Sequence, residues 1–209
     1  MGKLTHKVAR EVFNVTINKT IQHVYEDKEK GFLEILDNAK IFMGDDFSDN
    51  LYKEARKLAN NPEEKWMKYL NRIIDEIHPN VLKKTALNLG FEASLYGTKT
   101  IRQMRKIHKC NIPWLILMDP TSSCNLHCTG CWAAEYGNKL NLSYEDMDHI
   151  ITQGKKLGVY LYMFTGGEPL VRKDDIIRLC EKHNECQFHA FTNGTLIDEE
   201  FCKKNSRCW

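Results

Sequence analysis

Three cysteines lie close together in one short segment of this 209-residue chain. Cys124, Cys128 and Cys131 stand in the stretch "CNLHCTGCW", with the spacing C-x3-C-x2-C. Thiolates grouped in this way bind zinc or the irons of an iron–sulfur cluster, and a closed structural metal site usually has four protein ligands. The segment supplies three, so its chemistry depends on what fills the fourth position.

Two kinds of metal site are compatible with these thiolates. A structural zinc site would take His127 as its fourth ligand, but His127 directly precedes Cys128, and the two side chains could hardly converge on one ion. A cluster of four irons held by three cysteines would keep one iron open, which is typical of a catalytic metal centre. We interpret the other cysteines as structural, because they fall on apolar faces or near the chain end: Cys110, Cys180, Cys186, Cys202 and Cys208.

Two more polar segments follow short apolar runs later in the chain. The run "WLILM" (114–118) precedes the cysteines, "VYLYMF" (159–164) precedes "TGGEP", and "QFHAF" (187–191) precedes "TNGT". Such runs of apolar and β-forming residues are typical of buried strands. His189 alternates with core positions in the third run, which predicts a hydrogen-bonded histidine of the sheet.

Helical patterns separate these three predicted strands. Ser143 followed by Asp146 predicts a capping box at the start of one helix, and Gly158 predicts its end. A second helix carries Ile176 and Ile177, and a third begins after "TNGT". Strands that alternate with helices predict an α/β fold with a parallel sheet. The three polar segments would then meet at the carboxyl end of the sheet, where such folds carry their chemistry.

The first part of the chain has a different pattern. Residues 1–110 are predicted to form an all-helical region of unknown role, ahead of an α/β region at residues 111–209. The basic run "KTIRQMRKIHK" is interpreted as a solvated helix face. Two apolar stripes at helical spacing are expected to face a core: Phe13, Ile17, Ile21 and Val24, and Trp66, Leu70, Ile73 and Ile77.

Composition narrows the classes of protein to which the chain can belong. A net charge of +2 gives no indication of nucleic-acid binding. The longest strongly apolar run is far shorter than the roughly 20 residues of a membrane helix, and the first residues do not resemble a signal peptide. Clustered cysteines without such a signal indicate a reducing compartment, so a cytoplasmic location without a membrane partner is expected.

"CNLHCTGC" after the first strand and "GGEP" after the second make the chain resemble the radical S-adenosylmethionine (SAM) superfamily. The resemblance covers residues 113–209. It implies a [4Fe–4S] cluster bound by Cys124, Cys128 and Cys131, with the amino and carboxylate groups of SAM on the fourth iron. The implied activity is reductive cleavage of SAM to a 5′-deoxyadenosyl radical, which abstracts hydrogen from a substrate. An electron donor such as a flavodoxin or ferredoxin is implied as a partner.

The resemblance also assigns roles around the "GGEP" turn. Gly166 and Gly167 would let the backbone approach the methionine end of SAM, because glycine has no Cβ. Glu168 would accept a hydrogen bond from the SAM ammonium group, and Pro169 would stiffen the turn. The "TNG" segment resembles a third-strand end that lines the SAM pocket, which would add Thr192 and Asn193. The substrate, its recognition residues and any catalytic side chain stay open.

The chain departs from the family pattern in two respects. Gly130 stands where relatives often have an aromatic residue near the adenine; Trp132 or Tyr136 is a candidate replacement, and a core tryptophan is the alternative. The family fold is a partial (β/α)6 barrel, of which the chain holds about three βα units. We therefore expect a C-terminally truncated core that does not turn over a substrate alone. The alternative function is a non-catalytic remnant that binds at most an iron–sulfur cluster or a partner chain.

Overall fold

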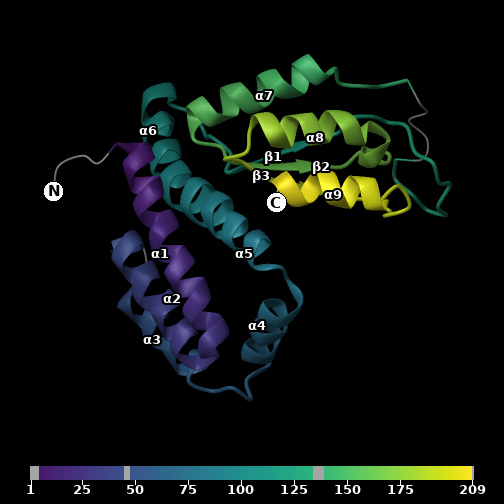
Figure 1. Ribbon diagram of the computed structural model, residues 1–209. Coiled ribbons are helices and arrows are strands. Elements are labelled where there is room, and N and C mark those ends of the chain that lie inside the picture. The colour runs from purple at the N-terminus through teal and green to yellow at the C-terminus, as the bar shows by residue number, and fades with distance from the viewer. Residues whose placement is uncertain (1–4, 45–47, 134–138, 209) are drawn as a thin grey trace. The chain divides into compact units, whose positions relative to one another are not determined.

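A computed structural model describes residues 5–44, 48–133 and 139–208 (Figure 1). The chain divides into two compact units, Met1–Leu87 and Asn88–Trp209. The first unit is helical, and its elements in chain order are α1 (His6–Glu26), α2 (Lys28–Met43), α3 (Asp49–Ala59), α4 (Lys65–Glu76) and α5 (Pro79–Thr85). Within the described residues, no helix is both long enough and apolar enough to cross a membrane.

Capping residues and a small core organise the helical unit. Asp27 separates α1 from α2, and its carboxylate accepts a hydrogen bond from the backbone N–H of Lys30 in the first turn of α2. This satisfies one of the N–H groups that a helix start leaves without an internal partner. The buried residues Phe32, Ala59 and Met67 pack together and join α2, α3 and α4.

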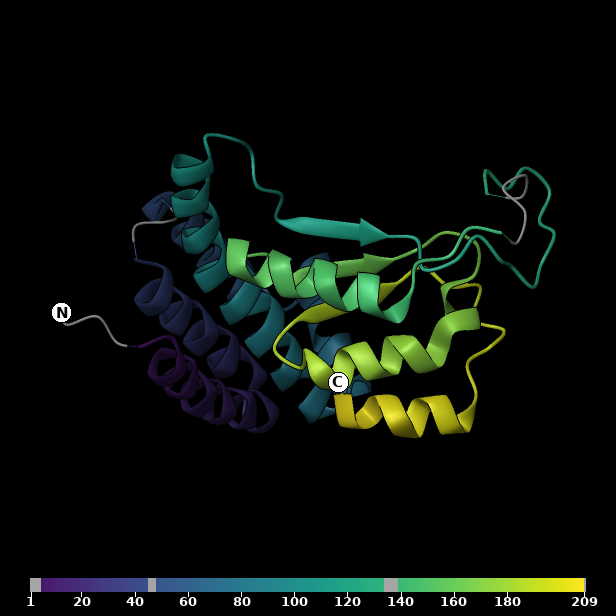
Figure 2. The ribbon, with the colours of Figure 1, turned by 90° about the horizontal axis from the view of Figure 1, so that it is seen from above.

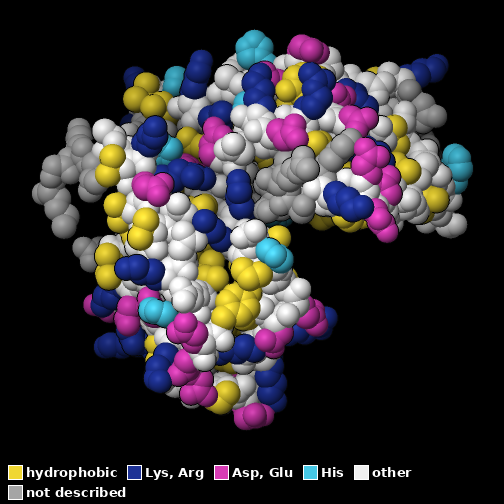
Figure 3. All heavy atoms as spheres, viewed as in Figure 1, with side chains coloured by type: hydrophobic (Ala, Val, Ile, Leu, Met, Phe, Trp, Pro, Cys, Tyr) yellow, Lys and Arg dark blue, Asp and Glu magenta, His cyan; other side chains and the backbone are white. Residues whose placement is uncertain are grey.

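The predicted apolar stripe of α4 does not face a core. Trp66 is 56% exposed, and Leu70 and Ile77 are exposed as well, whereas Met67 is the buried residue of α4. Figure 3 shows hydrophobic side chains at the surface of this unit, interspersed with acidic and basic ones. The prediction was wrong because helical spacing shows which residues share a face but not which face is covered. In α1, by contrast, Val24 is buried as expected.

The second unit contains a three-stranded parallel sheet in the order β1–β2–β3. Its strands are β1 (Leu115–Met118), β2 (Leu161–Phe164) and β3 (Gln187–Ala190). Its helical segments are η2 (Ala86–Gly97, π-helical), α6 (Thr98–His108), α7 (Tyr144–Leu157), η3 (Pro169–Arg172, a 3-10 turn), α8 (Lys173–Lys182) and α9 (Glu199–Cys208). The expected α/β fold with a parallel sheet is confirmed.

One face of the sheet is covered by helices. Phe188 of β3 stacks on both Tyr162 and Phe164 of β2. These rings belong to the same core as Met147 of α7 and Leu179 of α8. These side chains alternate along the strands with residues of the opposite face, as the pleat requires. On that opposite side, β1, β2 and β3 align Leu117, Met163 and His189 in one row.

Local signals in the sequence set the ends of α7. Ser143 and Asp146 form the predicted capping box, in which each side chain accepts a hydrogen bond from the other residue's backbone N–H. Gly158 ends the helix with φ +93°, in the region that favours glycine. A Cβ at Gly158 would lie 2.7 Å from the carbonyl oxygen of Gly97, so glycine is also required by close packing against η2.

The segment that precedes β1 packs against the amino end of the sheet. The side-chain amide of Asn88 donates hydrogen bonds to the carbonyl oxygens of Asn184 and Cys186, at 3.0 and 2.9 Å. The indole N–H of Trp114 donates to the carbonyl oxygen of Ala93. These contacts explain why the second unit begins at Asn88, within the region that the sequence marks as helical. Burial raises the pKa of the Cys186 thiol here, which keeps that cysteine in its unreactive form.

Candidate metal and cofactor site

The carboxyl ends of the three strands bring the polar segments together. Figure 2 shows the strands pointing toward the end of the unit from which the long segment after β1 extends. The N–H of Thr165 donates to the carbonyl oxygen of Met118, and the N–H of Phe191 donates to that of Phe164, both at 2.9 Å. These bonds continue the parallel pairing beyond the strands and bring the starts of the three segments side by side.

The segment after β1 is closed at its base. The N–H of Ser122 donates to the carbonyl oxygen of Leu140 at 2.8 Å, and the N–H of Leu142 donates to that of Pro120 at 3.1 Å. We call residues 123–139 the cysteine loop, and the paired residues 120–122 and 140–142 its neck. The neck fixes both ends of the loop, so the cysteines are presented from a defined base.

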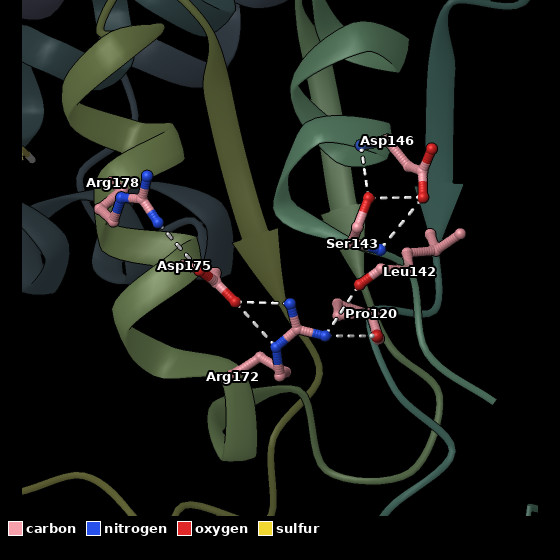
Figure 4. Close-up of polar contacts among 7 residues, drawn as sticks. All are labelled: Pro120, Leu142, Ser143, Asp146, Arg172, Asp175 and Arg178. Atoms are coloured by element: carbon pink, nitrogen blue, oxygen red, sulfur yellow. Dashed lines mark hydrogen bonds and ion pairs between the residues drawn. The ribbon is translucent and has the colours of Figure 1, made fainter. Parts of the chain in front are cut away.

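Arg172 holds the neck from the side of the "GGEP" segment (Figure 4). One guanidinium nitrogen donates to the carbonyl oxygens of Leu142 at 2.8 Å and Pro120 at 3.4 Å. The other two nitrogens donate to one carboxylate oxygen of Asp175, at 2.8 and 2.5 Å. A planar guanidinium suits this geometry because its donors point in fixed directions. Arg172 therefore joins η3 and α8 to both strands of the neck.

The "GGEP" turn lies directly against the residues that precede Cys124. The N–H of Gly167 donates to the carbonyl oxygen of Thr121 at 3.0 Å, and the N–H of Glu168 donates to that of Ser123 at 2.8 Å. A Cβ at Gly167 would lie 2.2 Å from the carbonyl oxygen of Ser123, closer than any side chain permits. Gly166 has φ +103°. Both glycines are thus explained by close contact with the cysteine segment, whatever else binds there.

The Glu168 carboxylate is turned into the protein and is 1% exposed. It accepts hydrogen bonds from the N–H of Leu170 at 2.8 Å, the hydroxyl of Thr192 at 2.7 Å and the N–H of Asn193 at 2.8 Å. Pro169, which is buried, starts η3 immediately after it. Glu168 therefore joins the second polar segment to the third, and Thr192 and Asn193 are held by it.

The third segment also contacts the cysteine loop. The side-chain amide of Asn193 donates to that of Asn125 at 2.9 Å, and Asn125 donates to the hydroxyl of Thr195 at 2.8 Å. Asn125 directly follows Cys124, so the start of the loop is fixed by side chains as well as by backbone. Its role was not expected, because a pairing across 68 residues leaves no local pattern in the sequence.

The three cysteines are free thiols, with Cys124 half-buried and Cys128 and Cys131 exposed. The N–H of Cys131 donates to the carbonyl oxygen of Cys128, and Gly130 has φ +75° inside this turn, which explains a glycine at that position. Among the described residues, no three His, Cys, Asp or Glu side chains are grouped to hold one metal ion. The structure thus brings the cysteines into one loop without converging their sulfurs, and His127 is exposed beside them.

A cavity of about 420 Å³ opens between the neck and the "GGEP" turn. Its wall includes Asp119, Thr121, Trp132, Gly166 and Gly167. Trp132 is 65% exposed, so the interpretation of this residue as a core tryptophan is wrong. The alternative candidate for adenine stacking, Tyr136, lies outside the described residues.

Other candidate residues take positions that the sequence did not indicate. His189 is exposed on the uncovered face of the sheet, and its ring has no hydrogen-bond partner among the described residues, contrary to expectation. Cys110 and Cys202 are exposed rather than packed in a core, whereas Cys180 and Cys186 are buried. The side chain of Cys208 lies outside the described part of the chain. Arg172 could have been suspected from its position three residues after the "GGEP" turn.

Comparison with known proteins matches residues 118–208 to the model of the Radical SAM superfamily. The chain is 36% identical over 96 residues to an Fe-coproporphyrin III synthase of Methanosarcina barkeri, a match that covers 43% of this chain and 23% of that protein. It is 38% identical over 86 residues to a GTP 3′,8-cyclase of Geobacter sulfurreducens, covering 38% of this chain and 26% of that protein.

An uncharacterized protein of Archaeoglobus fulgidus is 38% identical over 87 residues, covering 40% of this chain and 20% of that protein. The chain thus spans about a quarter of the length of these relatives. No solved structure matches the chain.

Proposed function

Residues 118–208 belong to the Radical SAM superfamily, and from this membership we propose that the chain binds a [4Fe–4S] cluster and SAM for radical chemistry. The observation that carries the proposal is the hydrogen-bonded contact between the cysteine loop and the "GGEP" turn, two motifs that fall within the matched residues. The bound group would supply reductive cleavage of a carbon–sulfur bond of SAM, and the protein would position the reactants.

Cys124, Cys128 and Cys131 would hold the cluster. Three exposed or half-buried thiols on one loop are a donor set suited to iron. The side chains of these cysteines would turn toward a common centre, while the neck and Arg172 hold the base from which they extend. A fixed base fits a site that is completed when the cluster is inserted.

The backbone of Gly166 and Gly167 would face the methionine end of SAM from the wall of the cavity. Glu168 would not contact SAM itself but would hold the "GGEP" and "TNG" segments in position, because its carboxylate already accepts three hydrogen bonds from them. Thr192 and Asn193 would line the adjacent side, held in place by Glu168. Trp132 is the described aromatic residue of the cavity wall and is the proposed contact for the adenine.

We also propose that the parallel sheet corresponds to the first half of a partial (β/α)6 barrel. Its uncovered face, with Leu117, Met163 and His189, would then face the interior of that barrel. An electron donor such as a flavodoxin or ferredoxin would supply the electron for SAM cleavage.

The test is anaerobic reconstitution of the full chain with iron and sulfide. The proposal predicts about four irons and four sulfides per chain, the content of one [4Fe–4S] cluster. Alanine at Cys124, Cys128 or Cys131 should each abolish this uptake, whereas Cys110→Ala, a matched change of another exposed cysteine, should not. Equal iron uptake by wild type and the three loop variants, or one tightly bound zinc in place of iron, would refute the proposal.

A further inference from the structure

Helix α4 has two apolar faces, and the core of the helical unit uses one of them. Met67 is buried, Ile74 is partly buried, and both pack with Phe32 and Ala59. The second face has the spacing i, i+3, i+4 and i+7, which places its residues on one side of a helix. We call this face the α4 patch, and it consists of Trp66, Tyr69, Leu70 and Ile73.

The α4 patch is aromatic and open to solvent. More than half of the surface of Trp66 and of Tyr69 is exposed, and Leu70 is exposed as well. The two rings meet edge to face with their centroids 6.4 Å apart, so they form one continuous apolar surface. Adjoining exposed apolar residues mark interaction sites, and tryptophan and tyrosine contribute most to protein interfaces. The patch therefore has the composition of a binding surface.

Charged side chains of opposite sign lie at the two ends of the patch. Lys65 begins α4, and its ammonium group lies over the Trp66 ring, 6.0 Å from the centroid. Glu76 is the last residue of α4 and forms an exposed ion pair with Arg72 at 2.8 Å. Because a turn takes 3.6 residues, Lys65 and Glu76 lie on the same flank of the helix, about three turns apart. An exposed ion pair contributes little, so Glu76 is able to exchange its partner.

We propose that the α4 patch packs against the α4 patch of a second copy of this chain, with the two helices antiparallel. In a two-fold symmetric interface every contact occurs twice. The antiparallel arrangement brings Lys65 of each copy to Glu76 of the other, so both ends of the contact gain an attractive pair. A parallel arrangement would place Lys65 against Lys65 and Glu76 against Glu76. The charge pattern therefore makes the patch complementary to itself in the antiparallel direction.

The size of the patch determines how strong this contact is. A fully covered tryptophan or tyrosine buries about 150–250 Å², so the exposed part of the patch offers about 300 Å² per copy. A stable protein interface buries about 800 Å² per partner. The two copies should therefore associate weakly and reversibly, with monomer and dimer in a concentration-dependent equilibrium.

Sedimentation equilibrium of the full chain without cofactors measures the association at several concentrations. The variants are Trp66→Ser and, as a matched control, Ile41→Ser, which changes an exposed apolar residue of α2 outside the patch. Trp66→Ser should raise the dissociation constant at least about 10-fold, because a central tryptophan is a typical hot spot of an interface. Ile41→Ser should leave it unchanged, and circular dichroism should show the same helix content in all three proteins.

Exchange of the charges tests the antiparallel direction. Lys65→Glu and Glu76→Lys should each raise the dissociation constant by about 3- to 10-fold, because each variant places like charges at both ends of the contact. The double variant, with both changes in one chain, restores opposite charges and should associate like wild type. A double variant as weak as the single ones would overturn the antiparallel contact.

Three other results would also overturn the inference. The first is a wild type that stays monomeric at every concentration, and the second is a Trp66→Ser variant that associates as tightly as wild type. The third is a monomeric wild type that binds phosphatidylcholine vesicles through Trp66, which would assign the patch to a membrane surface. Because the chain carries no cluster or SAM in these measurements, each outcome is independent of the proposed function.

Discussion

Replacing Glu168 by alanine is expected to destabilise the second unit strongly. The side chain accepts hydrogen bonds from two backbone groups, the buried N–H of Leu170 and the partly buried N–H of Asn193. Without an acceptor, a buried N–H costs about 1–3 kcal/mol, and the N–H of the exposed residue Asn193 costs less because water can replace the carboxylate. The hydroxyl of Thr192 is partly exposed and can donate to water, so it adds little. The free energy of unfolding should therefore fall by about 1–4 kcal/mol.

Urea unfolding of the chain without its cofactors, followed by circular dichroism, measures this loss. Glu168→Gln should lose about half as much free energy of unfolding. Its amide oxygen can still accept the hydrogen bond from Leu170, but its NH2 group would face the N–H of Asn193, and two donors cannot pair. The matched control is Glu181→Ala, which removes an exposed glutamate of α8 and should change the free energy of unfolding by less than about 0.5 kcal/mol. If Glu168→Ala were no less stable than Glu181→Ala, the inward-facing role of Glu168 would be refuted.

Three further outcomes are expected. Gly167→Ala should lower both stability and iron uptake, because its Cβ would meet the Ser123 carbonyl; normal iron uptake in that variant would contradict the contact. Arg172→Gln should reduce iron uptake on reconstitution, because it removes the hydrogen bonds to the carbonyl oxygens of Pro120 and Leu142 in the neck. Arg178→Gln, at an exposed position of α8, should not reduce it. Equal iron uptake by the two variants would show that the Arg172 bonds are not needed to hold the neck. Burial lowers the pKa of His183 from its ordinary value of 6.5, so folding favours the neutral ring. The free energy of unfolding should therefore fall as the pH drops from 7 to 5, and His183→Gln should flatten that dependence; an unchanged slope would show that other groups cause it.

The sequence was informative wherever a local pattern decides the structure. The alternation of strands and helices predicts the parallel sheet, and the pairing of Ser143 with Asp146 marks the start of α7. Gly158 marks its end. These features depend on residues within a few positions of one another, so they can be interpreted without knowledge of the rest of the chain.

Contacts between distant residues could not be predicted in the same way. The residues next to Glu168 in the sequence do not indicate that its carboxylate accepts hydrogen bonds from the segment that follows β3. From the sequence alone, the carboxylate is therefore expected to be available to a ligand. Gly167 is similar: the sequence suggests space for a cofactor, whereas the structure fills that space with the backbone of Ser123. The exposure of Trp66 and Trp132 depends on which surfaces other elements cover, and residue spacing does not contain that information.

Three cysteines should leave one iron of the proposed cluster open to SAM. Electron–nuclear double resonance of the reduced, reconstituted chain detects this contact, with SAM labelled by 15N in its amino group and 17O in its carboxylate. Hyperfine coupling of both labels to the cluster is expected in wild type. A cluster signal of normal intensity without coupling to either label would refute an iron open to SAM.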